Sequence, residues 1–325
     1  MFAKAVLAFI LCFCCAVHAK PVLPVILVFR TAPPTQAELQ YIERVNPFGF
    51  LLFAKEMNAA VPPIELKKDI ERRLKRKVYF FIDQEGGSVN RLKDPFPSAR
   101  AFGRLAADDP KEAAAQVQKT AYEMGRRLKE NGIDFVFAPV LDVGVSKSDF
   151  LNTRTYADTP KTVSLLAGAF TKGMHQAGIQ TCPKHAPGIG RSVYDPHENK
   201  ARISTPLAEL KAHDFYPFYQ NTDSCLMTGH IFYQAIDAET VSTFSPVFYR
   251  FIRNELNFNG WIIPDALNMK GLGEASDTEK ITKALTAGAD IVMPFFGPDV
   301  SFSRRETALK AIPADLIQRF QSRIP

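Results

Sequence analysis

Cysteine is scarce in this sequence, which holds five in 325 residues. Cys12, Cys14 and Cys15 lie near the start of the chain, so only Cys182 and Cys225 belong to the part that we expect to fold. Two cysteines exclude a disulfide-rich scaffold and a cysteine-rich zinc site. Both lie in strand-like segments, where a buried thiol is the usual interpretation, and the sequence does not decide whether they pair.

A hydrophobic run long enough to cross a membrane is also missing. The apolar run over residues 5–15 is shorter than the roughly 20 residues that a spanning helix needs. Lys4 precedes this run and a small-residue end, residues 17–19, follows it, a pattern that predicts a secretory signal peptide over residues 1–19. We therefore expect a folded domain over residues 20–325 that is exported to the periplasm and not stably inserted in a membrane. A short membrane anchor or a lipid anchor on an early cysteine is the alternative.

Two kinds of nucleotide-binding pattern are absent. No tract of lysine and arginine is interleaved with aromatic residues, as a nucleic-acid platform would be, and no G-x-G-x-x-G follows the first apolar run, as a dinucleotide site would require. The formal net charge of +6 suits a negatively charged envelope polymer as well as nucleic acid, and by itself it describes solubility more than function. We predict no nucleic-acid partner and no cofactor.

Short apolar runs recur along the whole chain, with amphipathic segments between them. They are rich in Val, Ile, Leu and Phe and nearly continuous, which is typical of parallel strands covered on both faces. The eight runs are residues 22–29, 48–54, 78–83, 135–142, 179–185, 225–230, 261–265 and 291–295. The clearest helical segments are residues 112–131, 161–177, 206–219 and 246–256. Eight strand–helix repeats without a linker predict a single-domain α/β fold, a (β/α)8 TIM-type barrel.

Polar and charged residues stand at the ends of these runs. Asp83 ends the third run, Lys184 and His185 end the fifth, His230 ends the sixth and Asp265 ends the seventh. Catalytic side chains in such barrels lie at the C-terminal ends of the strands and on the loops that follow them. The pattern therefore predicts a functional site at this rim, because solvated charges without a role would favour the helix faces.

The loop that follows the fifth run carries a titratable pair, Asp195 and His197, on either side of Pro196. The proline favours an extended conformation for Asp195. In that conformation side chains two residues apart point to the same side, so the carboxylate can orient the imidazole. The alternative interpretation is a polar surface loop.

A metal site is a further alternative, because His185, His197, His230 and Asp265 are all side chains that bind zinc. Against it, these histidines lack the short helical spacing of the common zinc motifs, and Lys184 would place a positive charge beside the metal. We predict no metal, and a metal-dependent hydrolase stays the alternative.

Six segments of the chain form a recognisable pattern: residues 81–87 (FIDQEGG), 137–143 (FAPVLDV), 184–188 (KHAPG), 226–230 (LMTGH), 264–271 (PDALNMKG) and 287–290 (AGAD). Through them the sequence resembles glycoside hydrolase family 3, and within it the single-domain bacterial β-N-acetylhexosaminidases of peptidoglycan recycling, over nearly all of the chain after residue 19. Agreement in order and spacing over six segments is not expected by chance.

The resemblance implies a role for each matched residue. It makes Asp265 the nucleophile and the Asp195/His197 pair the acid/base dyad. The residues that it implies for sugar binding are Asp83, Arg91, Arg154, Lys184, His185 and His230. Arg154 is assigned because residues 152–156 (NTRTY) follow the fourth run much as an arginine segment does in relatives, and an ordinary helical arginine is the alternative.

The resemblance also implies the activity, with departures around the site. We expect a retaining, exo-acting β-N-acetylglucosaminidase with a carbohydrate partner, acting through a covalent glycosyl-aspartate. Ala186, Ile189, Pro264 and Ala266 replace residues that are usual in relatives, and their effect on activity is open. The alternatives are a β-glucosidase or a phosphorylase of the same family, or a glycan-binding barrel without catalysis. The natural aglycone and the oligomeric state are not determined by the sequence.

Overall fold

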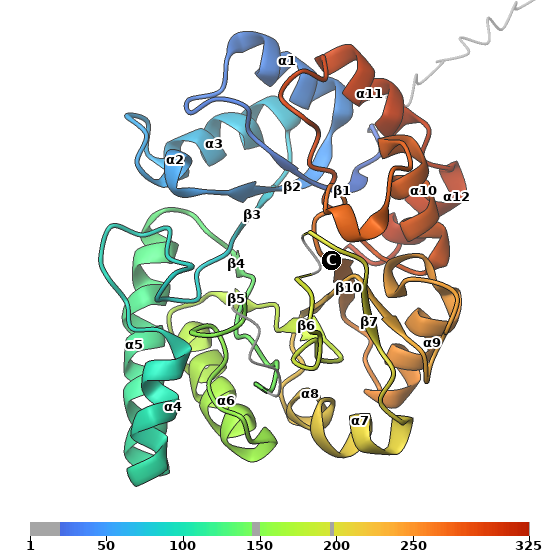
Figure 1. The fold of residues 1–325 in the computed structure, drawn as a ribbon. Coiled ribbons are helices and arrows are strands. Elements are labelled where there is room, and N and C mark those ends of the chain that lie inside the picture. Colours follow the sequence, from blue (N-terminus) through green and yellow to red (C-terminus); the bar gives the residue numbers. More distant parts are fainter. Residues whose placement is uncertain (1–19, 145–149, 196–197, 325) are drawn as a thin grey trace, which may run out of the picture.

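The computed structural model describes residues 20–144, 150–195 and 198–324. Parallel strands form three sheets in this part of the chain, and two of them build the barrel (Figure 1). The first sheet is β1 (Leu23–Val28), β2 (Pro47–Leu52), β3 (Tyr79–Ile82), β4 (Phe135–Val136) and β5 (Gln180–Thr181), in that order. The second is β10 (Trp261–Pro264), β8 (Cys225–Thr228) and β6 (Lys184–Ala186).

Backbone contacts at the sheet edges close these strands into a barrel. Val292 forms a parallel bridge with Val25, and the Ile26 N–H donates to the Val292 carbonyl at 2.9 Å. On the other side, the Asp290 N–H donates to the Ile262 carbonyl at 2.9 Å. The segment after residue 289 therefore lies between β10 and β1 as the eighth strand position. The predicted (β/α)8 barrel is confirmed.

Prolines account for the places where the expected strands are interrupted. The run expected over residues 179–185 is split into β5 and β6 at Pro183, and the run expected over residues 135–142 keeps regular pairing only before Pro139. Proline cannot donate to a ladder, so regular pairing stops there. The strand expected over residues 291–295 is reduced to the isolated bridge at Val292.

A parallel pair outside the barrel, β7 (Ala201–Ile203) with β9 (Ile231–Tyr233), was not predicted.

The helices lie around the outside of the strands (Figure 1). In chain order they are α1 (Gln36–Val45), α2 (Ala54–Met57), α3 (Pro63–Leu74), α4 (Ala99–Asp108), α5 (Pro110–Glu130), α6 (Pro160–Gln176), α7 (Leu207–His213), α8 (Tyr216–Gln220), α9 (Pro246–Glu255), α10 (Asp277–Ala287), α11 (Phe302–Lys310) and α12 (Ala314–Gln321), with short 3-10 turns at Ser242–Phe244 and Lys270–Leu272. The single helix expected over residues 206–219 is two helices, and Pro217 lies in the first turn of the second one. None of the helices in the described residues is long and apolar enough to cross a bilayer.

Local capping explains where several helices begin. The Ser276 hydroxyl accepts from the Glu279 N–H while the Glu279 carboxylate accepts from the Ser276 N–H, which is a capping box at the start of α10. Asp109 caps α5 by accepting from the N–H groups of Lys111 and Glu112, with Pro110 at the first helical position. Each such cap contributes about 1 kcal/mol.

The apolar residues form two layers, one inside the barrel and one between the strands and the helices. Alternation along β1 shows the division, because Ile26 belongs to the inner cluster while Val25 and Leu27 belong to the outer one. Aromatic rings fill much of the interior: the Phe81 and Phe135 ring centroids are 4.8 Å apart in a stacked pair. The barrel is therefore packed, and its site must lie at one end.

Cys182 and Cys225 pair as a disulfide inside the barrel, with their Cα atoms 4.8 Å apart. Both residues are fully buried. Cys182 follows β5 of the first sheet and Cys225 begins β8 of the second, so the bond joins the two sheets. The sequence left this pairing open because it depends on the register between strands that are far apart in the chain.

Candidate active site

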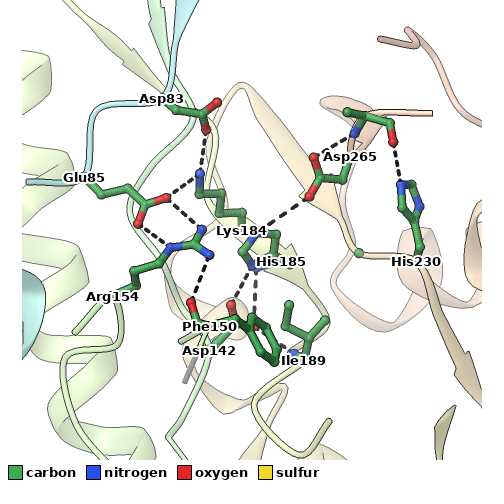
Figure 2. Close-up of polar contacts among 12 residues, drawn as sticks. Asp83, Glu85, Asp142, Phe150, Arg154, Lys184, His185, Ile189, His230 and Asp265 are labelled. Carbon is green, nitrogen blue, oxygen red and sulfur yellow. Dashed lines mark hydrogen bonds and ion pairs between the residues drawn. The ribbon is translucent and has the colours of Figure 1, made fainter. Parts of the chain in front are cut away.

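Charged side chains from several strand ends meet at the C-terminal end of the barrel (Figure 2). Asp83 follows β3, Lys184 and His185 belong to β6, and Asp265 follows β10. A cavity of about 440 Å³ opens here, and Asp83, Arg91 and Asp265 are among its polar lining residues. The sequence-predicted rim site is therefore a real cluster in space.

Lys184 and Arg154 hold one buried carboxylate, Glu85, between them. The Lys184 Nζ lies 2.6 Å from Asp83 Oδ1 and 2.6 Å from Glu85 Oε1. Arg154 binds the same carboxylate through two nitrogens, with Nε 2.9 Å from Oε2 and Nη2 2.9 Å from Oε1. The Lys184 and Glu85 side chains are only 3% and 4% exposed. A fork–fork contact of this kind fixes direction as well as charge.

The charges in this cluster stabilise one another against burial. Burial raises the pKa of Glu85, but Lys184 and Arg154 outweigh it and hold that pKa at about 2. Burial lowers the pKa of Lys184, but Asp83 and Glu85 outweigh it and raise that pKa above its ordinary value. The pKa of Arg154 is likewise raised, since Glu85 outweighs burial. Glu85, Lys184 and Arg154 are therefore ionised at neutral pH, and Lys184 joins them to Asp83, which lines the cavity.

His185 is oriented by a buried carboxylate behind it. Its Nδ1 lies 2.7 Å from Asp142 Oδ2, and the Ile189 N–H donates to Asp142 Oδ1 at 2.8 Å. Because a carboxylate accepts, Asp142 favours a proton on Nδ1 and turns Nε2 towards Asp265, whose Oδ2 is 3.9 Å away. Asp142 is completely buried, so it fixes the ring and does not itself face the cavity.

Asp265 is held by the backbone on either side of it. Its N–H donates to the Thr228 carbonyl at 2.9 Å, which continues the β10–β8 pairing by one residue. Its Oδ1 accepts from the Ala266 N–H at 2.7 Å. With 16% of the side chain exposed, the carboxylate lines the cavity without being open to bulk water.

The departures from the usual pattern leave these contacts in place. Pro264 pairs with Thr228 as the last residue of β10, and Ala266 supports Asp265 through its backbone N–H. Ala186 and Ile189 are buried in the outer apolar cluster. At these four positions the contacts come from the backbone or from apolar packing. They therefore do not depend on the side chains that are usual in relatives.

His230 lies behind the loop that carries Asp265, and it is not among the residues that line the cavity. The ring is fully buried, with Nδ1 2.6 Å from Thr243 Oγ1 and Nε2 3.0 Å from the Ala266 carbonyl oxygen. Because the carbonyl only accepts, Nε2 carries a proton and donates it to Ala266. His230 was expected to bind sugar, and from this place it would act through the loop that carries Asp265.

Arg91 and Asp195 are the remaining predicted residues in the described part of the chain. Arg91 lines the cavity with its guanidinium carbon 5.7 Å from the centre of the Phe53 ring. Asp195 is half-buried, and its carbonyl accepts from the N–H of Glu198, which lines the cavity. His197 lies outside the described residues.

Within the described part of the chain, no three His, Cys, Asp or Glu side chains gather to hold a metal ion. The expected absence of a metal stays a prediction.

Two residues of the cluster received no role from the sequence, Glu85 and Asp142. Both stand beside strand ends, Glu85 in the segment that begins at Asp83 and Asp142 at the end of the fourth run. Their positions were visible, but their roles depend on Lys184, Arg154 and His185, which come from other parts of the chain. The position of these two residues beside strand ends was thus a signal that the sequence offered. Their partners could not be identified from it.

Comparison with known proteins gives a family match over most of the chain. The model of the glycosyl hydrolase family 3 N terminal domain matches residues 35–314. A beta-hexosaminidase of Actinobacillus pleuropneumoniae serotype 5b is 32% identical over 267 residues, which cover 80% of this chain and 77% of that protein. A beta-hexosaminidase of Haemophilus influenzae is 31% identical over 266 residues, covering 79% and 75%.

Solved structures of similar fold point in the same direction. NagZ from Neisseria gonorrhoeae in complex with N-trifluoroacetyl-D-glucosamine superposes with a TM-score of 0.82 at 26% identity, covering 93% of this chain and 89% of that one. A glycoside hydrolase family 3 beta-N-acetylglucosaminidase from Paenibacillus sp. superposes with a TM-score of 0.79 at 25% identity, covering 92% of this chain and 60% of that one.

Proposed function

Because the chain belongs to glycosyl hydrolase family 3, we propose that this glycoside hydrolase is a retaining, exo-acting β-N-acetylglucosaminidase. Its substrate would be terminal β-linked N-acetylglucosamine on peptidoglycan-derived fragments. One observation carries the proposal: the Asp265 carboxylate lines a cavity together with Asp83, and Asp83 is bound by Lys184, which also binds Glu85. The nucleophile that the family pattern assigns thus stands where a sugar ring could be held beside it.

In the proposed reaction, Asp265 attacks the anomeric carbon and forms a covalent glycosyl ester while the bond to the leaving oxygen breaks. His197, oriented by Asp195, protonates that oxygen. The same pair then removes a proton from water as the water attacks the anomeric carbon and the bond from that carbon to the Asp265 oxygen breaks, which releases the sugar with retained configuration and regenerates the Asp265 carboxylate. Asp83, Arg154 and Lys184 would bind the sugar hydroxyls through charge-assisted hydrogen bonds.

The sugar preference and the compartment have separate support. The relatives are named beta-hexosaminidases, and a similar structure contains an N-acylated glucosamine analogue, which favours N-acetylglucosamine. Export to the periplasm is supported by the signal-like pattern of residues 1–19 and by the Cys182–Cys225 disulfide, since disulfides are rare in reducing compartments.

Hydrolysis of paired substrates tests the proposal. The purified protein should cleave an aryl β-N-acetylglucosaminide much faster than the matching β-glucoside, and phosphate should not be required. Asp265→Ala should remove the activity, while His197→Ala should still form the covalent ester from a substrate with a good leaving group. Preference for the glucoside, or release of a sugar phosphate, would replace the proposal by the corresponding family activity.

A further inference from the structure

The loop that leads from β6 to Asp195 is fixed to the barrel at successive positions near its start. The Tyr233 hydroxyl donates to the Gly188 carbonyl at 3.0 Å, and the Ile189 N–H donates to Asp142 at 2.8 Å. At Gly190 the backbone lies so close to Val143 that a Cβ would be 1.8 Å from the Val143 carbonyl oxygen. The first residues of the loop are therefore held in one path.

Arg191 is the last residue of this fixed part, and its side chain binds two carboxylates. Its Nε lies 2.7 Å from Asp214 Oδ2 and its Nη1 lies 2.9 Å from Glu209 Oε1. Asp214, at the C-terminal end of α7, is 1% exposed, and the Arg191 side chain is 17% exposed. A carboxylate buried to this degree needs its cationic partner, because an unpaired buried charge is strongly unfavourable.

Beyond Arg191 the loop makes a short turn towards Asp195. The Ser192 hydroxyl donates to the Tyr194 carbonyl at 2.6 Å, while Val193 and Tyr194 are 76% and 60% exposed. Among the described residues after Asp195, Glu198 pairs with Lys270, and both side chains are largely exposed to water. An exposed pair is worth little, whereas the Arg191–Asp214 pair is a buried attachment four residues before Asp195.

We propose that Arg191, through its ion pair with Asp214, positions the loop so that the Asp195/His197 pair reaches the leaving oxygen of the substrate. Arg191 touches neither substrate nor reacting atoms in this account, so it is a positioning residue. The inference rests on the proposed function, because the acid/base role of the pair is part of that proposal. Loss of Arg191 should then impair proton donation selectively and leave attack by Asp265 intact.

Two aryl N-acetylglucosaminides separate these steps. A phenyl leaving group needs protonation, whereas a 2,4-dinitrophenyl group departs without it, and kcat/KM reports formation of the covalent ester in both cases. Arg191→Ala should lower kcat/KM about tenfold or more on the phenyl substrate, since small misplacements of catalytic groups are costly. The value on the dinitrophenyl substrate should stay unchanged. Arg191→Lys, which retains the charge opposite Asp214, should recover part of the loss.

Arg253→Ala is the matched control for a structural loss. Arg253 also pairs with a buried carboxylate, Asp290, but at the other end of the barrel. This variant should lose stability without a dependence on the leaving group. An equal loss of Arg191→Ala on both substrates, or the same selective loss in Arg253→Ala, would overturn the inference.

Hydrogen exchange tests the anchoring without any turnover. Amides of residues 190–195 should exchange faster in Arg191→Ala than in the parent or in Arg253→Ala, and unchanged exchange would refute the anchoring. If the parent cleaved no N-acetylglucosaminide at all, the proposed function would fall by that result alone, whatever the exchange data showed about the loop.

Discussion

Glu85 and Asp290 are buried carboxylates at opposite ends of the barrel, and each is held by two cationic side chains. At the C-terminal end, Glu85 is bound by Lys184 and Arg154, and Lys184 also binds Asp83. At the N-terminal end, Asp290 is bound by Arg253 and Arg323. Because the two carboxylates have similar cationic partners, comparing them shows how their position in the barrel changes their role.

The two carboxylates differ in whether their networks include a side chain that lines the cavity. Asp290 also accepts from the Ile262 N–H at 2.7 Å, and Arg253 donates to the carbonyls of Phe258 and Gly260, so that network ties strand starts together. The Glu85 network includes Asp83, which is 21% exposed and lines the cavity. The N-terminal cluster therefore serves stability, and the C-terminal cluster serves both stability and the pocket.

Replacing Glu85 should give the largest effect. Glu85→Gln leaves Lys184 and Arg154 without their shared anion, so both side chains should shift, and Asp83, which lines the cavity and binds Lys184, should lose its position. We expect kcat/KM on an aryl N-acetylglucosaminide to fall about 100-fold, because positioning errors of about 1 Å have costs of that size. Steady-state kinetics on protein checked for folding by circular dichroism measures this, and parent-like kinetics would show that the cluster is only structural.

Asp290→Asn is the matching change at the other end. It should lower the free energy of unfolding by about 3 kcal/mol, because it leaves two arginines without their buried partner. The kcat/KM of the folded protein should equal that of the parent. Denaturant unfolding together with kinetics checks both parts, and a fall in kcat/KM as large as that of Glu85→Gln would erase the contrast between the two ends.

Asp142→Asn should give a smaller change in activity. The amide cannot hold the proton of His185 Nδ1 as the carboxylate does, so the ring loses its preferred tautomer and orientation. We expect about a tenfold loss of kcat/KM, in the range found when a supporting partner of a functional histidine is removed. The pH profile should change as well, and an unchanged profile with a general loss of stability would assign Asp142 to packing alone.

The acid dependence of stability sharpens the comparison further. The pKa of Glu85 is about 2 in the folded chain, below its ordinary value of 4.5, so its contribution is fully present above about pH 4.5 and is lost as the pH falls through about 2. The difference in free energy of unfolding between the parent and Glu85→Gln should therefore shrink over that interval. A difference that is constant from pH 7 to pH 2 would contradict the ionised cluster.

The sequence predicted the barrel and its functional end because both depend on local patterns. Apolar runs marked the strands, and polar residues such as Asp83 and Asp265 stood where those runs ended. The pairings could not be predicted in the same way. Glu85 with Arg154, and Cys182 with Cys225, are partners from distant segments, so they follow from strand order and register in three dimensions.

Some local errors also had local causes that the pattern did not weigh. Pro183 divided an expected strand and Pro217 divided an expected helix, since a proline removes a backbone donor. His230 ended a strand as its neighbours did and its ring contacts Thr243, while its expected role in sugar binding stays a prediction. The end of a strand therefore identifies candidates, and only the direction of the side chain decides which of them face the cavity.

Trapping the covalent intermediate tests whether Asp265 is the nucleophile. The protein would be incubated with a 5-fluoro N-acetylglucosamine analogue that carries a good leaving group, then digested and analysed by mass spectrometry. We expect one sugar label on the peptide that contains Asp265, and none in Asp265→Ala. A label on another residue, or steady hydrolysis of the analogue with no ester at Asp265, would show that Asp265 is not the nucleophile.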